Sequence, residues 1–131
     1  MNILFVCSYG GAKSVMAAAY FNQLARERGL DLVAAAAAAE EPYDAVPEPV
    51  ADHLQREGFD VRAFKPHRVA AGEIGSAARI IAIDCDVPGA EGAAGVERWD
   101  DVPPASVDLD GSSAAIRRHV TALVEELDGH R

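Results

Sequence analysis

Several features that mark other classes of protein are scarce or missing in this chain of 131 residues. Its only cysteines are Cys7 and Cys85, too few for a scaffold held together by disulfides. The sequence has no run of about 18 apolar residues, and its N-terminus has neither the basic residues nor the cleavage site of a signal peptide. We therefore expect a cytoplasmic protein whose cysteines are reactive or buried rather than bridged.

Positive charge is also scarce, because 12 Lys and Arg residues face 21 Asp and Glu residues and the formal net charge is -9. This balance works against binding to nucleic acid or to an anionic membrane surface. The four histidines have no metal-ligand spacing to one another or to the cysteines, so no metal site is expected. Any anion that the chain binds must therefore be captured locally, by a few well-placed groups.

What is present is an ordinary globular composition, with half of the residues hydrophobic and a quarter charged. The length suits a single domain spanning residues 1–131. Residues 3–6 form a continuous apolar run, which is typical of a strand covered on both faces. Residues 15–29 have a helical pattern that ends at Gly29, a suitable C-terminal cap. Strand, loop and helix together make the first half of a βαβ unit and predict a parallel sheet.

Later segments continue the alternation of strands and helices. Strands are predicted at 30–39, 79–83 and 96–99, helices at 49–57, 70–78 and 112–127, a short extended segment at 59–64, and loops or turns at 40–49, 65–68, 88–95 and 100–104. The six alanines at 34–39 favour a helix by intrinsic propensity, but a strand is expected after the first helix of a βαβ unit. The predicted fold is α/β, a single three-layer domain whose four-stranded parallel sheet is flanked by helices.

The loop between the first strand and the first helix carries the clearest chemical pattern. It begins with Cys7 and ends with the dipeptide Lys13-Ser14. Backbone N–H groups of such a loop point at one centre, and the helix that follows adds the positive end of its dipole, so the pocket should hold an anion. The expected anion-binding residues are Ser8, Tyr9, Gly10, Gly11, Ala12, Lys13 and Ser14.

Cys7 is expected where this positive field is strongest. The field favours a thiolate over a neutral thiol, which makes Cys7 a candidate nucleophile; a buried structural cysteine is the alternative. Cys85 follows the strand at 79–83, and the carboxyl ends of parallel strands meet at the same edge of a sheet. We therefore expect Cys85 within reach of Cys7, with Tyr9 and Trp99 at the rim of the pocket.

A nucleotide-binding P-loop, G-x4-G-K-S, is a competing interpretation of the same loop, because it also joins a strand to a helix. The chain fits that template poorly. Cys7 and Ala12 occupy the positions of its two glycines, and Asp84 is the only aspartate that follows a clear strand and is placed to bind magnesium. The pattern therefore favours a site based on the thiol.

The arrangement resembles the low-molecular-weight protein tyrosine phosphatases and the arsenate reductases that share their fold. The resemblance rests on the strand, the Cys-x5-basic-Ser loop and the helix at the N-terminus of a chain of this length, and it covers nearly the whole chain. Residues 14–20 resemble the first helix of the family, and residues 58–61 resemble the exit of its second helix. Within the family, the sequences at 81–85 and 99–105 are closer to the reductases.

The resemblance implies a role for each matched residue. Cys7 attacks phosphorus or arsenic, and Ser14 supports its thiolate. Lys13 and the loop amides hold the oxyanion, while Asp101 protonates the leaving group. In a reductase, Cys85 would resolve the Cys7 adduct as a disulfide, which thioredoxin or a small thiol would reduce. No bound cofactor is expected, and the substrate carries phosphate, arsenate or a similar oxyanion.

Three departures from the family pattern affect the expected activity. Lys13 replaces an arginine whose planar fork grips two oxygens at once, and losing that contact would cost on the order of 10² in rate. Gly10 replaces an asparagine of the reductases, and Pro103 stands where the family has the aspartate that serves as its general acid. We therefore predict an arsenate reductase-like or phosphatase-like enzyme; the alternative is a weakened member that binds an oxyanion or a phosphorylated partner without turnover.

Overall fold

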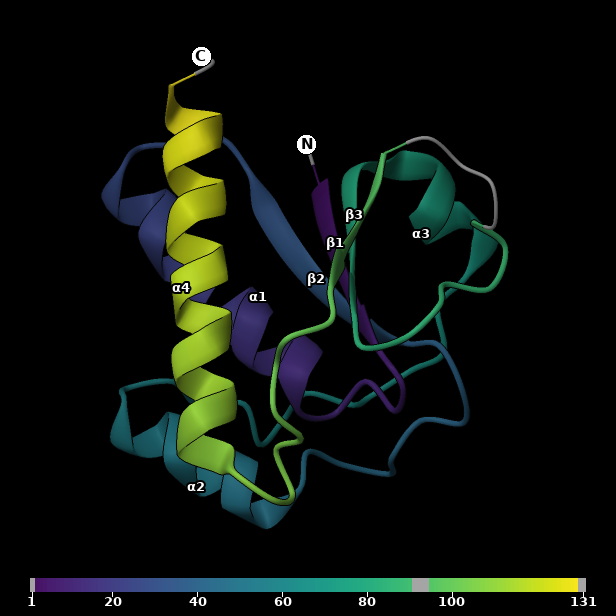
Figure 1. The fold of residues 1–131 in the computed structure, drawn as a ribbon, viewed down its shortest axis with the longest axis vertical. Coiled ribbons are helices and arrows are strands. Elements are labelled where there is room, and N and C mark those ends of the chain that lie inside the picture. Colours follow the sequence, from purple (N-terminus) through teal and green to yellow (C-terminus); the bar gives the residue numbers. More distant parts are fainter. Residues whose placement is uncertain (1, 91–94, 130–131) are drawn as a thin grey trace.

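The computed structural model describes residues 2–90 and 95–129, which form an α/β fold in three layers (Figure 1). Its sheet contains β1 (Asn2–Cys7), β2 (Val33–Ala38), β3 (Ala77–Ile83) and β4 (Val96–Trp99), all parallel and in the order β2-β1-β3-β4. The helices are α1 (Lys13–Glu27), α2 (Glu48–Arg56), α3 (Ala71–Ser76) and α4 (Leu109–Asp128). This architecture confirms the predicted fold class. Within the described ranges, no helix combines the length and the apolar character needed to cross a bilayer.

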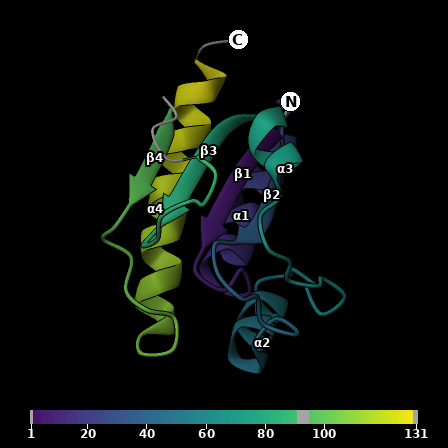
Figure 2. The same cartoon turned by 90° about the vertical axis from the view of Figure 1, so that its right-hand side faces the viewer.

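The helices divide between the two faces of the sheet. Figure 2 shows α1 and α4 on one face and α3 on the other, and α2 packs into the same hydrophobic cluster as α1 and α4. The side chains of β1 alternate between the two layers, because successive residues of a strand point to opposite faces. Phe5 and Cys7 belong to the larger cluster beneath α1 and α4, whereas Leu4 and Val6 belong to the smaller cluster on the opposite face.

The alanine-rich strand β2 forms as predicted, against its helix propensity. It is an edge strand that pairs along its whole length with β1. Asn22 of α1 satisfies both backbone groups of Ala34, since its side chain accepts from the Ala34 N–H at 2.8 Å and donates to the Ala34 carbonyl at 3.2 Å. At the other end, Ala38 donates its N–H to the carbonyl of His67 and accepts from the N–H of Val69, both at 2.8 Å. These contacts protect an edge that would otherwise be open to pairing with other chains.

Helix α1 ends in the cap that was predicted at Gly29. The residue has a φ of +67°, its N–H donates to the carbonyl of Arg26, and the N–H of Leu30 donates to the carbonyl of Ala25. This pair of bonds is a Schellman motif, which satisfies carbonyls at the end of a helix. The motif turns the chain from α1 toward β2.

The structure differs from the sequence-based prediction in several places. The prediction of an extended segment at 59–64 is wrong, because the N–H of Phe64 donates to the carbonyl of Val61 and closes a turn. Helix α4 begins at Leu109 rather than at Ser112, since the side chain of Asp108 caps it by accepting from a first-turn N–H. The helix predicted at 70–78 is shorter, because β3 already begins at Ala77. Part of the loop predicted at 88–95, namely residues 91–94, lies outside the described residues.

Candidate active site

The loop from Cys7 to Lys13 is anchored from outside by the segment that follows β2. Main-chain carbonyls of residues 7–9 accept hydrogen bonds from N–H groups within residues 39–43, at distances from 2.8 to 3.2 Å. The N–H of a trans peptide points away from its carbonyl, so the N–H groups of residues 8–10 face the inside of the loop. This arrangement provides the donors that an anion requires.

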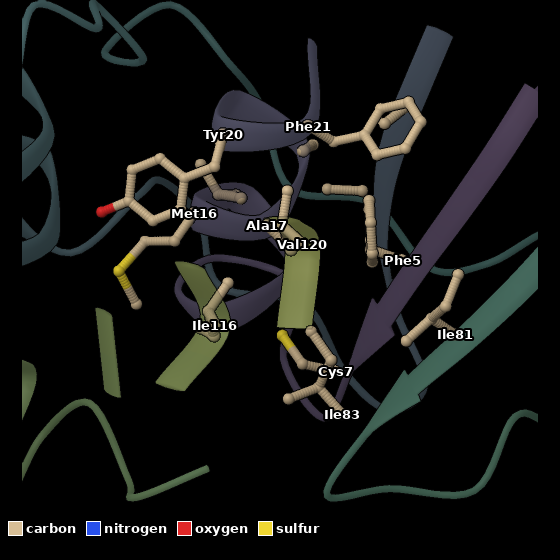
Figure 3. Packing of buried hydrophobic residues seen from close by; sticks show 14 of the residues in the cluster. Phe5, Cys7, Met16, Ala17, Tyr20, Phe21, Ile81, Ile83, Ile116 and Val120 are labelled. Carbon is tan, nitrogen blue, oxygen red and sulfur yellow. The ribbon is translucent and has the colours of Figure 1, made fainter. Parts of the chain in front are cut away.

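The sulfur of Cys7 lies against the N-terminus of α1. The residue that caps this helix, Ala12, offers no side-chain hydrogen bond, and instead the Ser14 N–H points at Cys7 Sγ from 3.5 Å. The Cys7 thiol donates to Ser14 Oγ at 3.2 Å, and both residues are buried. Figure 3 shows Cys7 at the end of β1 beside Ile83. When the thiol loses its proton, the Ser14 hydroxyl can donate to the sulfur, so helix and serine both stabilise negative charge there.

Two glycines let the loop pack closely against its neighbours. Gly10 has a φ of +65°, and a Cβ at this position would lie 2.8 Å from the backbone nitrogen of Ala38. A Cβ at Gly11 would lie 2.6 Å from the ring of Tyr43. Any larger residue at these two positions would therefore displace the loop from β2 or from the tyrosine ring.

Lys13 is paired with a carboxylate of the chain itself. Its Nζ lies 2.7 Å from Asp84 Oδ2 and 3.4 Å from the carbonyl oxygen of Val102. Asp84 directly follows β3 with a φ of +53°, and its N–H donates to the carbonyl of Trp99 at 3.1 Å. The Lys13–Asp84 pair as a whole carries no net charge. The loop therefore differs from one whose basic residue has no carboxylate partner and offers its full positive charge to an anion.

The loop opens into a pocket of about 300 Å³. The rings of Tyr9 and Tyr43 flank it, with centroids 5.1 Å apart. The other lining residues are Cys7, Ser8, Gly11, Ala12, Lys13, Pro47, Pro49, Val50, Ile83, Asp84, Pro104, Ala105 and Ser106. A mostly apolar pocket with a few polar groups at its base is typical of a site for a small molecule or a side chain. Tyr9, predicted at the rim, is one of the residues that line the pocket.

The structure does not bring Cys85 into this pocket. Its thiol donates to the carbonyl of Val6 at 3.4 Å, and its side chain packs against the hydrophobic cluster on the face of the sheet opposite to Cys7. Burial, together with the negative charge of a Cys7 thiolate, raises the pKa of Cys85 to about 11. At neutral pH, Cys85 is therefore a neutral thiol.

Asp101 also lies outside the set of described residues that line the pocket. Its carboxylate accepts a hydrogen bond from His119 at 2.7 Å, and this bond holds the pKa of Asp101 below its usual range. The ring of His119 stacks on Trp99, with centroids 4.7 Å apart. Trp99 itself is buried against Phe5 rather than placed at the rim.

Asp84 and Tyr43 line the pocket but were not among the residues predicted to bind the oxyanion. Asp84 was recognisable as a polar residue at the carboxyl end of a central strand, which is where ligands of open parallel sheets bind. Tyr43 gave no comparable signal, because it lies in a loop whose path depends on tertiary contacts. Its N–H bonds to the carbonyl of Tyr9, and this bond brings the two rings together.

Comparisons with known proteins agree with the geometry. The model of the protein family described as low molecular weight phosphotyrosine protein phosphatase matches residues 2–92 of this chain. A comparison with curated protein sequences gives no match.

Three solved structures illustrate the likeness of the fold. YfkJ from Bacillus subtilis is 21% identical with a TM-score of 0.83, and the alignment covers 100% of this chain and 96% of YfkJ. A low molecular weight phosphotyrosine phosphatase from Vibrio cholerae O395 is 18% identical with a TM-score of 0.83, covering 97% and 96% of the two chains. An arsenate reductase from Archaeoglobus fulgidus DSM 4304 is 28% identical with a TM-score of 0.71, covering 97% and 98%.

Proposed function

The chain belongs to the low molecular weight phosphotyrosine protein phosphatase family, and from this premise we propose that Cys7 attacks a tetrahedral oxyanion bound in the loop at 7–14. Membership places the protein in a family of enzymes of the phosphatase or arsenate reductase class. One observation carries the proposal. The Cys7 sulfur lies in the pocket at the N-terminus of α1, with both the hydroxyl and the N–H of Ser14 at hydrogen-bonding distance from it.

The proposed reaction has two steps on phosphorus. The Cys7 thiolate forms an S–P bond while the bond from phosphorus to the leaving oxygen breaks, and that oxygen takes up a proton from solvent water. Loop amides and Lys13 stabilise the charge on the equatorial oxygens. Water then attacks the phosphorus of the phosphocysteine and gives a proton to the solvent, while the S–P bond breaks, so that phosphate leaves and the Cys7 thiolate is restored.

We favour the phosphatase-like reaction over the reductase-like one because of Cys85. A resolving cysteine must reach the Cys7 adduct as a thiolate. Cys85 instead packs on the opposite face of the sheet, and its pKa is raised to about 11. Water needs no second thiol, so the phosphatase-like route uses the site as it stands.

Hydrolysis of p-nitrophenyl phosphate tests this proposal. Wild type should release p-nitrophenol and Cys7→Ser should not, while Cys85→Ser keeps its activity. A phosphoryl group trapped by rapid acid quench should map to the peptide that contains Cys7. Turnover that survives in Cys7→Ser would contradict the proposal.

Arsenate reduction is the second candidate, because the thiol of Cys85 bonds to the carbonyl of Val6, the residue next to Cys7. This route requires a rearrangement after β3 that carries the Cys85 sulfur across to Cys7. It also requires thioredoxin or a small thiol as the reductant. We propose that the protein acts in the cytoplasm, because a reducing compartment would keep both cysteines free, as they are in the structure. Arsenate-dependent oxidation of thioredoxin that is lost in Cys85→Ser would support it.

The third possibility is a member that binds its ligand without turnover, and Lys13→Arg separates it from an enzyme. Lysine is held by Asp84 and by the carbonyl of Val102. If lysine belongs to a working site, arginine should change kcat by less than about tenfold. A gain of about 100-fold or more from an undetectable level would instead mean that the natural protein is a binder.

A further inference from the structure

We propose that the pocket selects a zwitterionic ligand, in which the oxyanion is carried by a small group that bears an ammonium or a guanidinium. The inference rests on the function proposed above, because it names the substrate class of the same site. It starts from the charges inside the pocket. Among the described residues that line it, Lys13 is the one basic residue and Asp84 the one carboxylate.

The ion pair of Lys13 and Asp84 constrains what can bind. The two side chains are only 15% and 28% exposed, so solvent screens them less than a surface pair. A plain phosphate dianion must compete with Asp84 for the ammonium of Lys13, and it then lies near an unpartnered carboxylate. Repulsion between these like charges opposes binding.

A zwitterion avoids this conflict by exchanging partners. Its oxyanion takes the loop amides and Lys13, while its cation replaces Lys13 as the partner of Asp84. Every charge then has a partner of opposite sign within the pocket, which is the condition for burying charges without a large penalty. The Lys13–Asp84 ion pair therefore matches the charge pattern of the ligand.

The surroundings of the pocket favour a cation as well. Tyr9 and Tyr43 are 45% and 43% exposed, and the faces of their rings attract cations. Glu40 and Asp44 are exposed in the same loop as Tyr43, whose side chain lines the pocket. A cation carried by the ligand would therefore meet tyrosine rings in the wall of the pocket in addition to the carboxylate of Asp84.

A matched pair of phosphate esters tests the proposal. O-phosphoethanolamine and propyl phosphate have the same length, and they differ in an ammonium that replaces a methyl group. Calorimetric titration of the full chain carrying Cys7→Ser measures binding without the covalent step. O-phosphoethanolamine should bind at least about tenfold more tightly than propyl phosphate, as expected for a charge-assisted hydrogen bond in a partly buried site.

Asp84→Asn should abolish this preference. Asparagine tolerates a positive φ, so the backbone at this position need not change. In the variant, propyl phosphate should bind more tightly than before and O-phosphoethanolamine more weakly, so the ratio of the two Kd values should approach one. Asp31→Asn is the matched control, because it changes the net charge equally at an exposed residue before β2, at the opposite end of the strand from the loop. It should leave the ratio unchanged.

The outcomes separate this inference from the function on which it rests. Equal affinity for the two esters in the parent protein overturns the inference, even if Asp84→Asn does not fold. Equal weakening of both esters by Asp84→Asn also overturns it, because Asp84 would then only position Lys13. If neither ester nor inorganic phosphate binds, the proposed oxyanion site itself fails.

Discussion

The two thiols of this protein have contrasting surroundings. Cys7 lies in the pocket at a helix N-terminus, whereas Cys85 is packed on the other face of the sheet with a pKa raised to about 11. A thiol reacts through its thiolate. The pKa of Cys85 lies about four units above pH 7, so at this pH only about 1 in 10⁴ of the protein molecules carries Cys85 as a thiolate.

Iodoacetamide should therefore modify Cys7 well before Cys85 at pH 7, as followed by peptide mass spectrometry. The rate at Cys85 should rise about tenfold for each pH unit up to its pKa. Inorganic phosphate should protect Cys7 and leave Cys85 unaffected. Faster labelling of Cys85 would show that it is more accessible and more acidic than the structure indicates.

Asp101 is the second residue for which the structure gives a sharp expectation. A general acid must hold a proton and reach the leaving group, but Asp101 is ionised beside His119 and does not line the pocket. Asp101→Asn should lower kcat for phenyl phosphate, a substrate with a poor leaving group, by less than about threefold. A loss of about 100-fold, the typical contribution of a general acid, would return Asp101 to that role.

At the scale of single elements, β2 depends on Asn22. Both backbone groups of the buried Ala34 bond to this one side chain. Asn22→Ala leaves the N–H and the carbonyl unsatisfied, and it should lower the free energy of unfolding by about 1–3 kcal/mol. Urea denaturation measures the change. Glu27→Ala, at an exposed position of the same helix, is the control and should change stability by less than about 0.5 kcal/mol.

The order of the elements was predictable because apolar runs and glycine caps are local signals. The strand at β2 followed from the requirement of a βαβ unit, and its alanines alone would have given a helix. The loop at 7–14 was predicted as an anion site from the spacing of Cys7 and Ser14, and the fold brings these two side chains into contact. The positions of Cys85 and Asp101 were not accessible in this way. Each lies in irregular backbone after a strand, where a small change of backbone angles moves the side chain to another face.

At the scale of the whole molecule, Tyr20 joins three helices. Its hydroxyl lies 2.5 Å from Glu57, which follows α2, and 2.7 Å from Ser113 in α4. The side chain is fully buried, and the guanidinium of Arg117 lies 4.0 Å from the centre of its ring. Burial, followed by the hydrogen bond with Glu57, raises the pKa of Tyr20 to about 12 from its ordinary value of 10.0.

This shift predicts a dependence of stability on pH. The folded protein holds the phenolic proton more tightly than the unfolded chain, so the contribution is complete below pH 10 and is lost as the pH rises toward 12. The loss should reach up to about 3 kcal/mol, since each pKa unit corresponds to about 1.4 kcal/mol. Urea denaturation across this range should show the stability advantage of wild type over Tyr20→Phe shrinking. If the free energies of unfolding of the two proteins instead changed in parallel with pH, the raised pKa of Tyr20 would be refuted.

The close contact between Gly10 and Ala38 has a consequence for protein engineering. A Cβ at position 10 would lie 2.8 Å from a backbone nitrogen of β2, an atom that cannot rotate aside as a side chain can. Exchanging this loop for that of a relative with asparagine at this position would therefore require a compensating redesign of the strand. The loop therefore cannot be transferred between relatives on its own. The residue at position 10 should vary with the backbone position of β2 rather than with the identity of the substrate.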